Sequence, residues 1–574
     1  MTTGADLLCR ALDARGVACV FGVPGTDSIP LHEALRRSRI RVVLATHELA
    51  ASFMANGYYR ASGRVAPVVT IRGPGFTYAL TGLAEALHDS AAVLHLAGCT
   101  PDADPRRYFQ ALDQPAIARP MVKGVRRIDE AGDIWTAVAE SLELALRGEP
   151  GPVLLEWNPK VLAGGAPPAP AGAAASHERL DDAVVERAAT FIASAQRPVV
   201  LAGQGCAGAP ELLREFAELL GAPVVTTASG RGVLAEDHPL ALGFDLVRST
   251  LEAAGELFRQ ADRVIAVGCK LGATIRLDLP ADRLVRVDTS PAALASPNPA
   301  HVSILASAEA FLAAVTPAVK RLRRPSAPSW SPGEIQEWRR RLQAGVDEAE
   351  PIVHGARPST AKAFFSALRA ALPREGIVVA DSGLHQTLLR RHFDVFASRG
   401  LLLPSDFQSM GFGLPASIGA SLAAPMRPVV AIVGDGGFAM SGLELLTAVR
   451  EKIPLTVVVF VDGTLNRIRL TQLKRYGHSA HVDLLNPDFT LFAEAVGAQH
   501  ARCDGDAESV LRRAIASKGV TLVEVRVGDS AAIQASRIGG LVRGVGRRAV
   551  GPRGIESLRN IRRRLRGAGK ETRR

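Results

Sequence analysis

The sequence predicts an α/β protein of three domains, each built on a doubly wound parallel sheet. Short apolar runs alternate with longer segments of helical periodicity over most of the 574 residues. Strands that are apolar on both faces are typical of parallel sheets, which helices cover on both sides. Two Pro-rich breaks, at 162–178 and 323–334, divide this alternation into bodies that each have the size of one domain.

The predicted domains span residues 1–165, 179–322 and 355–530, and a basic tail follows at 531–574. In the first domain the strand-like runs are VACVFG, IRVVLAT, PVVTIRG and AVLHLAG. In the third domain they are GIVVADSG, VVAIVGDGG, PLTVVVFVDG and TLVEVRV. Ligands of such sheets collect at the carboxyl ends of the strands, so polar residues that directly follow these runs are candidates for a binding site.

The composition excludes several classes of protein. The chain is 47% hydrophobic and 22% charged, as in ordinary globular proteins. No run approaches the roughly 20 apolar residues that cross a bilayer, and the N-terminus shows no basic-then-apolar leader, so we expect a cytoplasmic protein. The six cysteines form no CxxC pair, which indicates reduced thiols in the core rather than a zinc site or a disulfide scaffold.

The excess of positive charge is confined to the tail. Residues 531–574 hold 13 of the 68 Lys and Arg residues and two of the 57 Asp and Glu residues, so the tail alone accounts for the net charge of +11. We expect this tail to be disordered. Electrostatic contact of the tail with nucleic acid or with a membrane surface is the alternative.

Two acids follow neighbouring strands of the third domain. Asp435 comes directly after one apolar run, and Asp462 follows the next, after a predicted helix at 441–451 and a predicted strand at 455–461. A right-handed crossover commonly returns the chain beside the strand it left, so both carboxylates are expected at one edge of the sheet. Paired carboxylates suit Mg²⁺, and the glycines around Asp435 leave backbone N–H groups free to face a diphosphate. Two simple turns, with Asp435 as a helix cap, are the alternative.

The chain resembles the thiamine diphosphate-dependent enzymes over residues 5–530, and it is most similar to the acetolactate synthase branch of that family. The GDG sequence, followed by a polar pair after the crossover, resembles the family's cofactor signature. Further segments match the family in the same order along the chain: VFGVPGT, ATHELAASFMANGYYRASG, RGPGFTYALTGLAEALHDS, RPVVLAGQG, LGAPVVTTASGRGVLAEDHPLALG and QSMGFGLPASIGA. The resemblance implies a pyrimidine-binding first domain, a central Rossmann-like domain and a diphosphate-binding third domain.

The resemblance also implies roles for single residues. Glu48 would contact the aminopyrimidine of the cofactor and promote deprotonation of the thiazolium C2. Its context agrees, because Glu48 follows an apolar strand and opens a helix, where a carboxylate caps backbone donors or meets a ligand. Met410 would support the bent form of the cofactor, with core packing as the alternative. His385, with Gln386, would lie near the diphosphate.

The same resemblance implies a set of metal and diphosphate contacts. Most relatives carry Asn at the position of Asp462, but a second carboxylate still suits Mg²⁺. The implied ligands of Mg²⁺ are Asp435, Asp462 and Thr464. The implied contacts of the diphosphate are Gly434, Gly436 and Gly437.

The substrate would lie against residues of the first domain. Phe109, Gln110 and Lys123 match a Phe-Gln loop and a lysine that line the acceptor side of the family's pocket, although a lone Lys is usually a solvated charge. Thr26 and Arg72 depart from the synthase pattern. Arg72 would pair with a substrate carboxylate or phosphate, or it would support a loop. These departures leave the identity of the substrate open.

The central domain contains a weak nucleotide-binding signal. Gly203, Gly205 and Gly208 form a GxGxxG sequence after a strand, but no acid follows at the position that an NAD site requires. Synthases that bind flavin hold FAD in this domain. The segment VGCKLGATIRLD, at 267–278, lacks the Asp-Asp-Arg-like sequence expected of them, so FAD is left open and this segment argues against it.

The sequence therefore predicts a thiamine diphosphate- and Mg²⁺-dependent enzyme that decarboxylates a 2-oxo acid, with pyruvate as the first choice, and joins the product to an acceptor carbonyl. A decarboxylase or lyase that does not ligate is the alternative within the family. An alternative of another class is a catalytically silent homologue that acts as a binding protein. The resemblance implies a homodimer or homotetramer with sites at the subunit interface.

Overall fold

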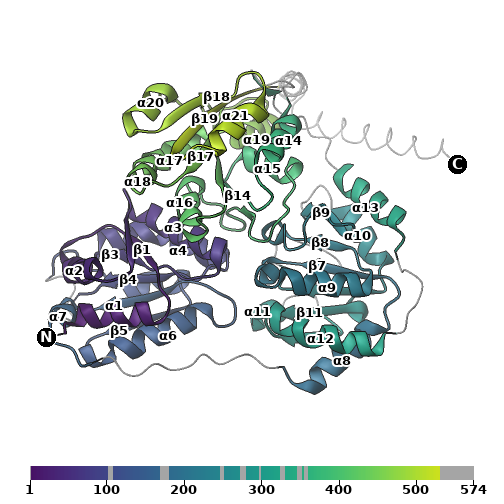
Figure 1. The fold of residues 1–574 in the computed structure, drawn as a ribbon, viewed down its shortest axis with the longest axis horizontal. Helices are drawn as coiled ribbons and strands as arrows, with labels where there is room; N and C mark the ends of the chain where they lie inside the picture. The colour runs from purple at the N-terminus through teal and green to yellow at the C-terminus, as the bar shows by residue number, and fades with distance from the viewer. Residues whose placement is uncertain are drawn as a thin grey trace, which may run out of the picture.

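The computed structural model describes residues 2–100, 108–168, 180–245, 251–271, 279–295, 299–323, 330–344, 352–354 and 360–529. In these ranges the chain forms three sheets, each flanked by helices. In Figure 1 the first domain lies at the left, the second at the right and the third above them. The predicted basic tail and parts of both Pro-rich breaks lie outside the described residues. The predicted α/β class with three parallel-sheet domains is confirmed.

The first sheet has six parallel strands in the order β2-β1-β3-β4-β6-β5. Its strands are β1 (Cys19–Gly22), β2 (Arg41–Leu44), β3 (Val68–Thr70), β4 (Leu94–Gly98), β5 (Gly124–Ile128) and β6 (Val153–Trp157). Its helices are α1 (Gly4–Ala14), α2 (Ile29–Arg37), α3 (Glu48–Ser62), α4 (Pro74–His88), α5 (Gln114–Ala118), α6 (Ile134–Leu146) and α7 (Pro159–Ala163).

The second sheet also has six parallel strands, in the order β12-β11-β10-β7-β8-β9. Its strands are β7 (Pro198–Ala202), β8 (Val224–Thr226), β9 (Ala241–Asp245), β10 (Arg263–Val267), β11 (Leu284–Asp288) and β12 (Val302–Leu305). The helices are α8 (Asp182–Ala193), α9 (Pro210–Leu220), α10 (Leu251–Gln260), α11 (Pro291–Leu294), α12 (Ala308–Leu322) and α13 (Pro332–Ala344). Trp338 and Leu342 of α13 belong to the core beside this sheet.

The third sheet has the order β13-β19-β17-β16-β14-β15, and β18 also pairs with β19. Only β13 runs antiparallel to its neighbour among these described strands. The strands are β13 (Ile352–Val353), β14 (Ile377–Ala380), β15 (Leu401–Leu402), β16 (Val429–Gly434), β17 (Leu455–Val461), β18 (Gln499–Arg502) and β19 (Val520–Gly528). The helices are α14 (Ala361–Ala371), α15 (Leu384–His392), α16 (Gly413–Ala423), α17 (Asp435–Ser441), α18 (Leu445–Arg450), α19 (Asn466–Tyr476), α20 (Phe489–Val496) and α21 (Ala507–Ile515).

Local sequence signals set the ends of several elements. At the start of α1, the Thr3 hydroxyl accepts the Asp6 N–H while the Asp6 carboxylate accepts the Thr3 N–H, which is a capping box. At the end of α3, Gly63 takes the left-handed conformation that favours glycine. The helix predicted at 441–451 differs: the chain turns into α17 at Asp435, passes through a 3-10 turn, η8 (Gly442–Glu444), and continues as α18.

The first and third domains meet along α3 and α16, which lie together in Figure 1. A side chain on Gly57 of α3 would collide with the Ala416 carbonyl of α16, and one on Gly419 of α16 would collide with the Met54 carbonyl of α3. Glycine at these two positions therefore allows the two helix backbones to approach closely. This contact fixes the position of the start of α3, at Glu48, relative to the third sheet.

A buried ion pair reinforces the same interface. Arg60 of α3 and Asp89, directly after α4, lie 2.8 Å apart, and their side chains are only 2% and 0% exposed. Arg60 also donates to the Leu403 carbonyl of the third domain, and Asp89 accepts the Ser405 N–H. The pair thus ties two elements of the first domain to the chain that follows β15.

The cysteines lie in the interior of the protein. All six cysteines are buried and unpaired, as predicted for reduced thiols in a core. In the described ranges, no helix has the length and apolar character to cross a membrane.

Arg60→Met should destabilise the fold, because it leaves the Asp89 carboxylate buried without its cation. We expect a loss of about 3–5 kcal/mol in the free energy of unfolding, measured by urea unfolding. Arg36→Met is the matched control, since Arg36 pairs with Glu33 on the exposed surface, and it should cost less than about 1 kcal/mol. Equal costs for the two variants would contradict the prediction.

Candidate functional site

Two acids stand at one edge of the third sheet. β16 and β17 are parallel neighbours, with Gly434 opposite Phe460. Asp435 therefore follows the end of β16 beside the point where Asp462 follows the end of β17. One carboxylate oxygen of Asp435, Oδ2, accepts the N–H groups of Asp462 at 3.2 Å and Gly463 at 2.7 Å. We call this group of strand ends the acid edge, defined by residues 434–437 and 462–464.

Short-range hydrogen bonds hold the second acid in place. The Asp462 Oδ1 accepts the amide and the hydroxyl of Thr464, and its Oδ2 accepts the Asn466 amide at 2.6 Å. Burial raises the pKa of Asp462, and the charge of Asp435 raises it further. The Asn486 amide donates to Asp435 Oδ2 at 2.8 Å. A buried carboxylate, Asp435, beside the partly buried carboxylate of Asp462 makes a site that can attract a cation, because the two like charges repel each other.

The three glycines of the acid edge are closely surrounded. A Cβ on Gly434 would lie 3.0 Å from the His385 ring, and one on Gly437 would collide with the Asp381 carboxylate. A Cβ on Gly436 would lie 2.9 Å from Leu465 and 3.3 Å from the end of the Met410 side chain. The structure thus brings Met410 and His385, both predicted from the sequence, to the acid edge.

His385 of α15 is buried and neutral. Its Nε2 lies 3.0 Å from the Asp381 carbonyl, which can only accept, so Nε2 carries the proton and Nδ1 is left as an acceptor. Desolvation lowers the pKa of His385 to about 4. Gln386 has a different role, because its side-chain amide donates to the Pro404 carbonyl.

Asp381 was not predicted, although it follows β14 as Asp435 follows β16. It is fully buried, and its Oδ1 accepts the Ser382 N–H at 2.7 Å. Its Oδ2 accepts the Gly411 N–H at 3.0 Å, next to Met410 and the start of α16. Desolvation raises the pKa of Asp381 to about 7, against the lowering effect of these backbone donors. The signal for Asp381 was its place directly after an apolar strand.

Glu48 is the first residue of α3. The helix cap is His47, whose Nδ1 accepts the Leu49 N–H at 3.1 Å. The Glu48 carboxylate makes no hydrogen bond or ion pair with any described residue, and its Oε1 lies 3.0 Å from the place of a Cβ on Gly75. Capping is therefore done by the neighbour, and the Glu48 carboxylate is left available.

Glu444 holds the turn that precedes Glu48, and it too was missed from the sequence. The Glu444 Oε1 accepts the N–H of Thr46 at 3.0 Å and also the Thr46 hydroxyl, and its Oε2 accepts the Thr447 hydroxyl at 2.7 Å. Burial raises the pKa of Glu444. Since Glu444 lies in η8, directly after α17, the acid edge and the start of α3 are mechanically linked. No described hydrogen bond or ion pair joins Glu48 itself to Met410, Asp435 or Asp462.

Arg72 supports a loop in this structure. Its guanidinium lies 3.3 Å from the Asp27 carboxylate, and both side chains are largely buried. It also donates to the carbonyls of Phe109 at 3.1 Å and Cys99 at 3.3 Å. Of the two roles considered for Arg72, the geometry favours loop support. Thr26, next to Asp27, is exposed.

The Phe-Gln loop lies at the carboxyl edge of the first sheet. Phe109 is 78% exposed, and Gln110 has a left-handed backbone with φ 59°. A Cβ on Gly73, at the start of α4, would lie 2.5 Å from the Gln110 carbonyl, so the loop sits directly on this turn. The buried Gln114, which sequence reasoning missed, holds the loop by accepting the Gly73 N–H and donating to the Gly98 carbonyl.

Within one chain, the structure does not bring Lys123 to the Phe-Gln loop. Lys123 precedes β5, and its Nζ donates to the Arg147 carbonyl at 2.6 Å. Lys123 and Leu87 both flank Gly151, so Lys123 lies beside the last turn of α4. Gln110 lies beside the first turn of α4, and a helix of 15 residues is about 22 Å long. In this chain Lys123 is therefore far from Phe109 and Gln110.

The glycine loop of the central domain is occupied by its own backbone. A Cβ on Gly203 would collide with the Gly268 carbonyl, and one on Gly205 would lie 2.7 Å from the Gly268 Cα. These glycines serve the packing of two loops. The segment 267–278, which argues against FAD, lies partly outside the described residues, so the question of FAD stays open.

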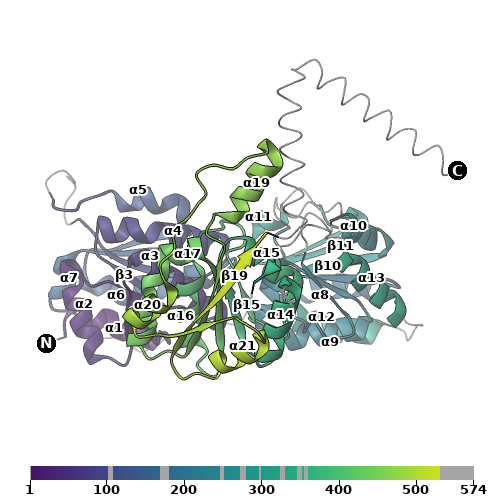
Figure 2. The ribbon, with the colours of Figure 1, turned by 90° about the horizontal axis from the view of Figure 1, so that it is seen from above.

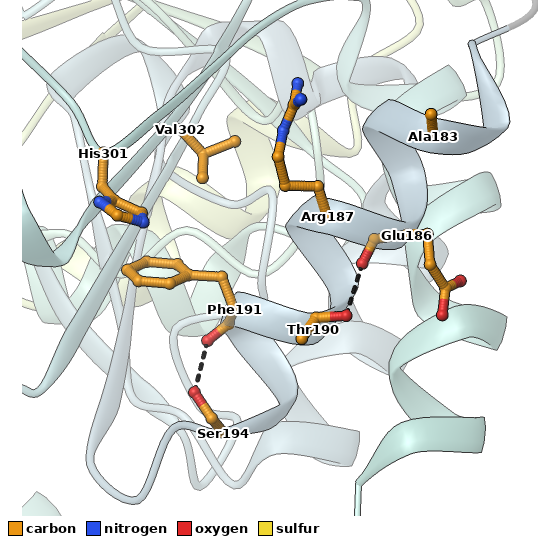
Figure 3. Close-up of a pocket in the computed structure, with 8 residues that line it drawn as sticks. All are labelled: Ala183, Glu186, Arg187, Thr190, Phe191, Ser194, His301 and Val302. Atoms are coloured by element: carbon orange, nitrogen blue, oxygen red, sulfur yellow. Dashed lines mark hydrogen bonds between the residues drawn. The ribbon is translucent and has the colours of Figure 1, made fainter.

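A surface hollow of about 550 Å³ lies in the central domain between α8 and β12 (Figure 3). Phe191 stacks on His301 with ring centroids 4.3 Å apart, and Glu186 pairs with Arg321 outside the hollow. The hollow is in a different domain from the acid edge, and none of the predicted site residues lines it.

Comparison with known proteins gives matches along most of the chain. The descriptions of the matching family models are thiamine pyrophosphate enzyme, N-terminal TPP binding domain, at residues 2–117; central domain, at 185–315; and C-terminal TPP binding domain, at 381–525. A probable acetolactate synthase large subunit of Methanocaldococcus jannaschii is 31% identical over 92% of this chain and 93% of its own length.

Two other relatives bear on the reaction. The acetolactate synthase isozyme 2 large subunit of Escherichia coli is 30% identical over 92% of this chain and 96% of its own length. A probable 2-ketoarginine decarboxylase of Pseudomonas aeruginosa is 32% identical over 91% of this chain and 94% of its own length. The chain is thus similar to a synthase and to a decarboxylase at nearly equal identity.

If Arg72 and Asp27 act as one supporting pair, their substitutions should not be additive. We expect the cycle of Arg72→Met, Asp27→Asn and the double variant to show a coupling of about 0.5–3 kcal/mol in the free energy of unfolding. Additive effects, together with an unfolding energy that Arg72→Met leaves unchanged, would instead favour an Arg72 that is free for a substrate anion.

Proposed function

The chain belongs to the thiamine pyrophosphate enzyme family, and we propose that it uses thiamine diphosphate and Mg²⁺ to decarboxylate a 2-oxo acid and to join the product to an acceptor carbonyl, as an acetolactate synthase does. The observation that carries this proposal is the acid edge, where Asp435 and Asp462 follow adjacent strands beside a glycine turn. Pyruvate is the first choice of substrate because two synthases cover nearly the whole chain.

The residues of the acid edge fit a metal and a diphosphate. The donor set is hard oxygen: the Asp435 and Asp462 carboxylates and the Thr464 hydroxyl, which suits Mg²⁺ with phosphate and water completing its shell. In the described residues, no group of three or more His, Cys, Asp and Glu side chains competes as a metal site. The glycines of α17 present backbone N–H groups at a helix start, where an anion is stabilised.

Three side chains have roles that follow from their surroundings. Glu48 is an unpaired carboxylate at a helix N-terminus, so it is able to hold a proton against a ring nitrogen of a bound cofactor. Met410 reaches the acid edge with an apolar thioether, which would support a ring without competing for its hydrogen bonds. His385 offers an acceptor at Nδ1 next to Gly434. Thiamine diphosphate, when bound, supplies the thiazolium ring that stabilises a carbanion after decarboxylation.

We propose that the site is completed by a second copy of the chain. Within the described part of one chain, Glu48 has no hydrogen bond or ion pair with the acid edge, although Glu444 links the turn before Glu48 to η8. An exposed apolar face is formed by large side chains that precede Glu48 or follow residues 434–437 in the sequence. Exposed apolar faces of this kind mark contacts with a partner. These side chains are Leu44, Met440, Leu443 and Leu446. A homodimer would cover this face and bring Glu48 of one chain to the acid edge of the other.

A decarboxylase that does not ligate is the second candidate, supported by the 32% identity to the probable 2-ketoarginine decarboxylase. The two candidates differ in what happens after carbon dioxide leaves. A ligase transfers the remaining fragment to a second carbonyl compound, and a decarboxylase releases it as an aldehyde. The difference depends on whether a second carbonyl compound can bind beside the cofactor. The exposed Phe109 and the loop around Gln110 are the first candidates to line such a pocket.

The product distribution tests the proposed reaction. With Mg²⁺ and thiamine diphosphate present, we expect pyruvate to give carbon dioxide and acetolactate in equal amounts, measured by gas release and mass spectrometry. Glu48→Gln should keep cofactor affinity but lose about 100-fold or more in turnover, because an amide does not take up the proton. Aldehyde as the main product from a panel of 2-oxo acids would favour the decarboxylase. No turnover of any acid by the wild-type protein would support a silent homologue.

The two acids of the acid edge should differ in how far their substitution weakens cofactor binding. Asp462→Asn should keep affinity for thiamine diphosphate with Mg²⁺ to within about tenfold, since an amide oxygen still binds Mg²⁺. Asp435→Ala should weaken it by about 100-fold or more, because it removes both a metal ligand and the acceptor of two backbone N–H groups. The cofactor-dependent rise in melting temperature measures both effects. A rise that persists in Asp435→Ala would place the metal elsewhere.

A further inference from the structure

The segment that carries Met410 is held by buried acids. We define the Met410 segment as residues 405–411, between β15 and α16. Three of its backbone N–H groups donate to carboxylates: Ser405 to Asp89, Ser409 to Glu85, and Gly411 to Asp381. Gln408 has a left-handed backbone with φ 65°, a conformation that a residue with a side chain keeps only when its surroundings hold it. Acids of the first and third domains therefore hold this segment in its conformation.

Glu85 and Asp381 accept the N–H groups on either side of Met410, from Ser409 and Gly411 respectively. Glu85 comes from α4 of the first domain, and its Oε2 accepts the Ser409 N–H at 2.8 Å. The Glu85 side chain is 0% exposed, and its Oε1 has no hydrogen-bond partner. A buried carboxyl oxygen without a partner is costly, and the contact with Ser409 and the nearby charge of Arg60 offset part of this cost.

The charges around Glu85 do not balance. Asp89, one helical turn after Glu85, is a second acid, and the cation that acts on Glu85 is Arg60 of α3. Asp406 of the Met410 segment adds a further negative charge near Asp89. Arg60 is already paired with Asp89 at 2.8 Å. Desolvation, followed by the charge of Asp89, raises the pKa of Glu85 to about 7. Glu85 thus changes its charge in the neutral range while Arg60 stays with Asp89.

We propose that Glu85 is a positioning residue of the cofactor site, which places Met410 against the acid edge by holding the Ser409 amide. This inference rests on the proposed function, because Met410 matters only if a cofactor binds there. Glu85 touches neither the acid edge nor Glu48 and acts through the backbone of its neighbour. The end of the Met410 side chain lies beside Gly436, so a shift of the segment moves Met410 relative to the glycine turn.

The closed Met410 segment should lose stability when Glu85 ionises, because the charge is buried beside Asp89. The pKa of Glu85 in the folded chain, about 7, lies above its ordinary value of 4.5. A raised pKa of this kind adds stability that is fully present below pH 4.5 and is lost as the pH rises through 7. A buried negative charge beside Asp89 is relieved if the Met410 segment opens and admits water. We therefore expect the segment to open more often at pH 8 than at pH 6.

Amide hydrogen exchange of the full-length, cofactor-free protein tests the proposal without activity. Peptides that cover residues 405–411 are followed at pH 6 and pH 8, with correction for the intrinsic rate of exchange. Glu85→Leu should raise exchange at pH 6 by about tenfold, because the Ser409 N–H loses its acceptor. Glu85→Gln keeps an acceptor oxygen and should exchange like the wild type at pH 6. It should lack the wild-type increase at pH 8.

Glu156→Gln is the matched control, since Glu156 is also buried in the first domain but accepts from Gln114 and does not touch the segment. It should leave exchange of residues 405–411 unchanged at both pH values. The proposal is overturned if Glu85→Gln shows the same increase between pH 6 and pH 8 as the wild type. If Glu85→Leu does not fold, this comparison of Glu85→Gln with the wild type still decides.

Calorimetry with thiamine diphosphate and Mg²⁺ separates the proposal from the function it rests on. We expect Glu85→Leu to bind about tenfold more weakly than the wild type, and Glu85→Gln to bind within about twofold of it at pH 6. A wild type that does not bind would overturn the proposed function and the cofactor role of Glu85 together. A wild type that binds, with Glu85→Leu binding equally well, would overturn the role of Glu85 alone.

Discussion

The parallel pairing of β16 with β17 is the constraint on which the rest of the site depends. It places two carboxylates at neighbouring strand ends, where backbone N–H groups and glycines surround them. Two carboxylates at the ends of adjacent strands repel each other, and a cation between them relieves this repulsion. In the proposed function, the acid edge binds a metal and, through the metal, a diphosphate. The close crossing of α3 and α16, which Gly57 and Gly419 permit, then sets where Glu48 stands relative to this sheet.

Around this edge, buried acids act as supports for other parts of the site. Asp381, Glu85 and Glu444 each accept backbone N–H groups from a segment that carries a predicted site residue or its neighbour. Carboxylates are strong acceptors, and in a dry interior they hold a turn more firmly than neutral groups do. The cost is desolvation, which raises the pKa of all three acids. For Glu85, whose pKa is raised to about 7, this cost should make the Met410 segment open more often above neutrality.

Much of the fold was predictable from the sequence because strand periodicity and Pro-rich breaks are local signals. The strand at 455–461 and the helix that begins at Glu48 have the bounds that were expected. Residues whose role depends on packing between domains were not predictable. Glu444 and Glu85 meet segments more than 300 positions away, and nothing near them in the sequence indicates this. The separation of Lys123 from Gln110 was not predictable either. The two residues lie beside opposite ends of α4, and the sequence between them does not show how the chain runs along that helix. Helix α19, which projects from the body in Figure 2, likewise gave no sequence signal of its position.

The most direct test of the central claim is a calorimetric titration of the purified wild-type protein with thiamine diphosphate, carried out with and without Mg²⁺. If the acid edge binds the diphosphate through a metal, heat of binding should appear with Mg²⁺ and disappear when the metal is chelated. Binding that is equally tight without any divalent ion, or no binding in its presence, would contradict the account.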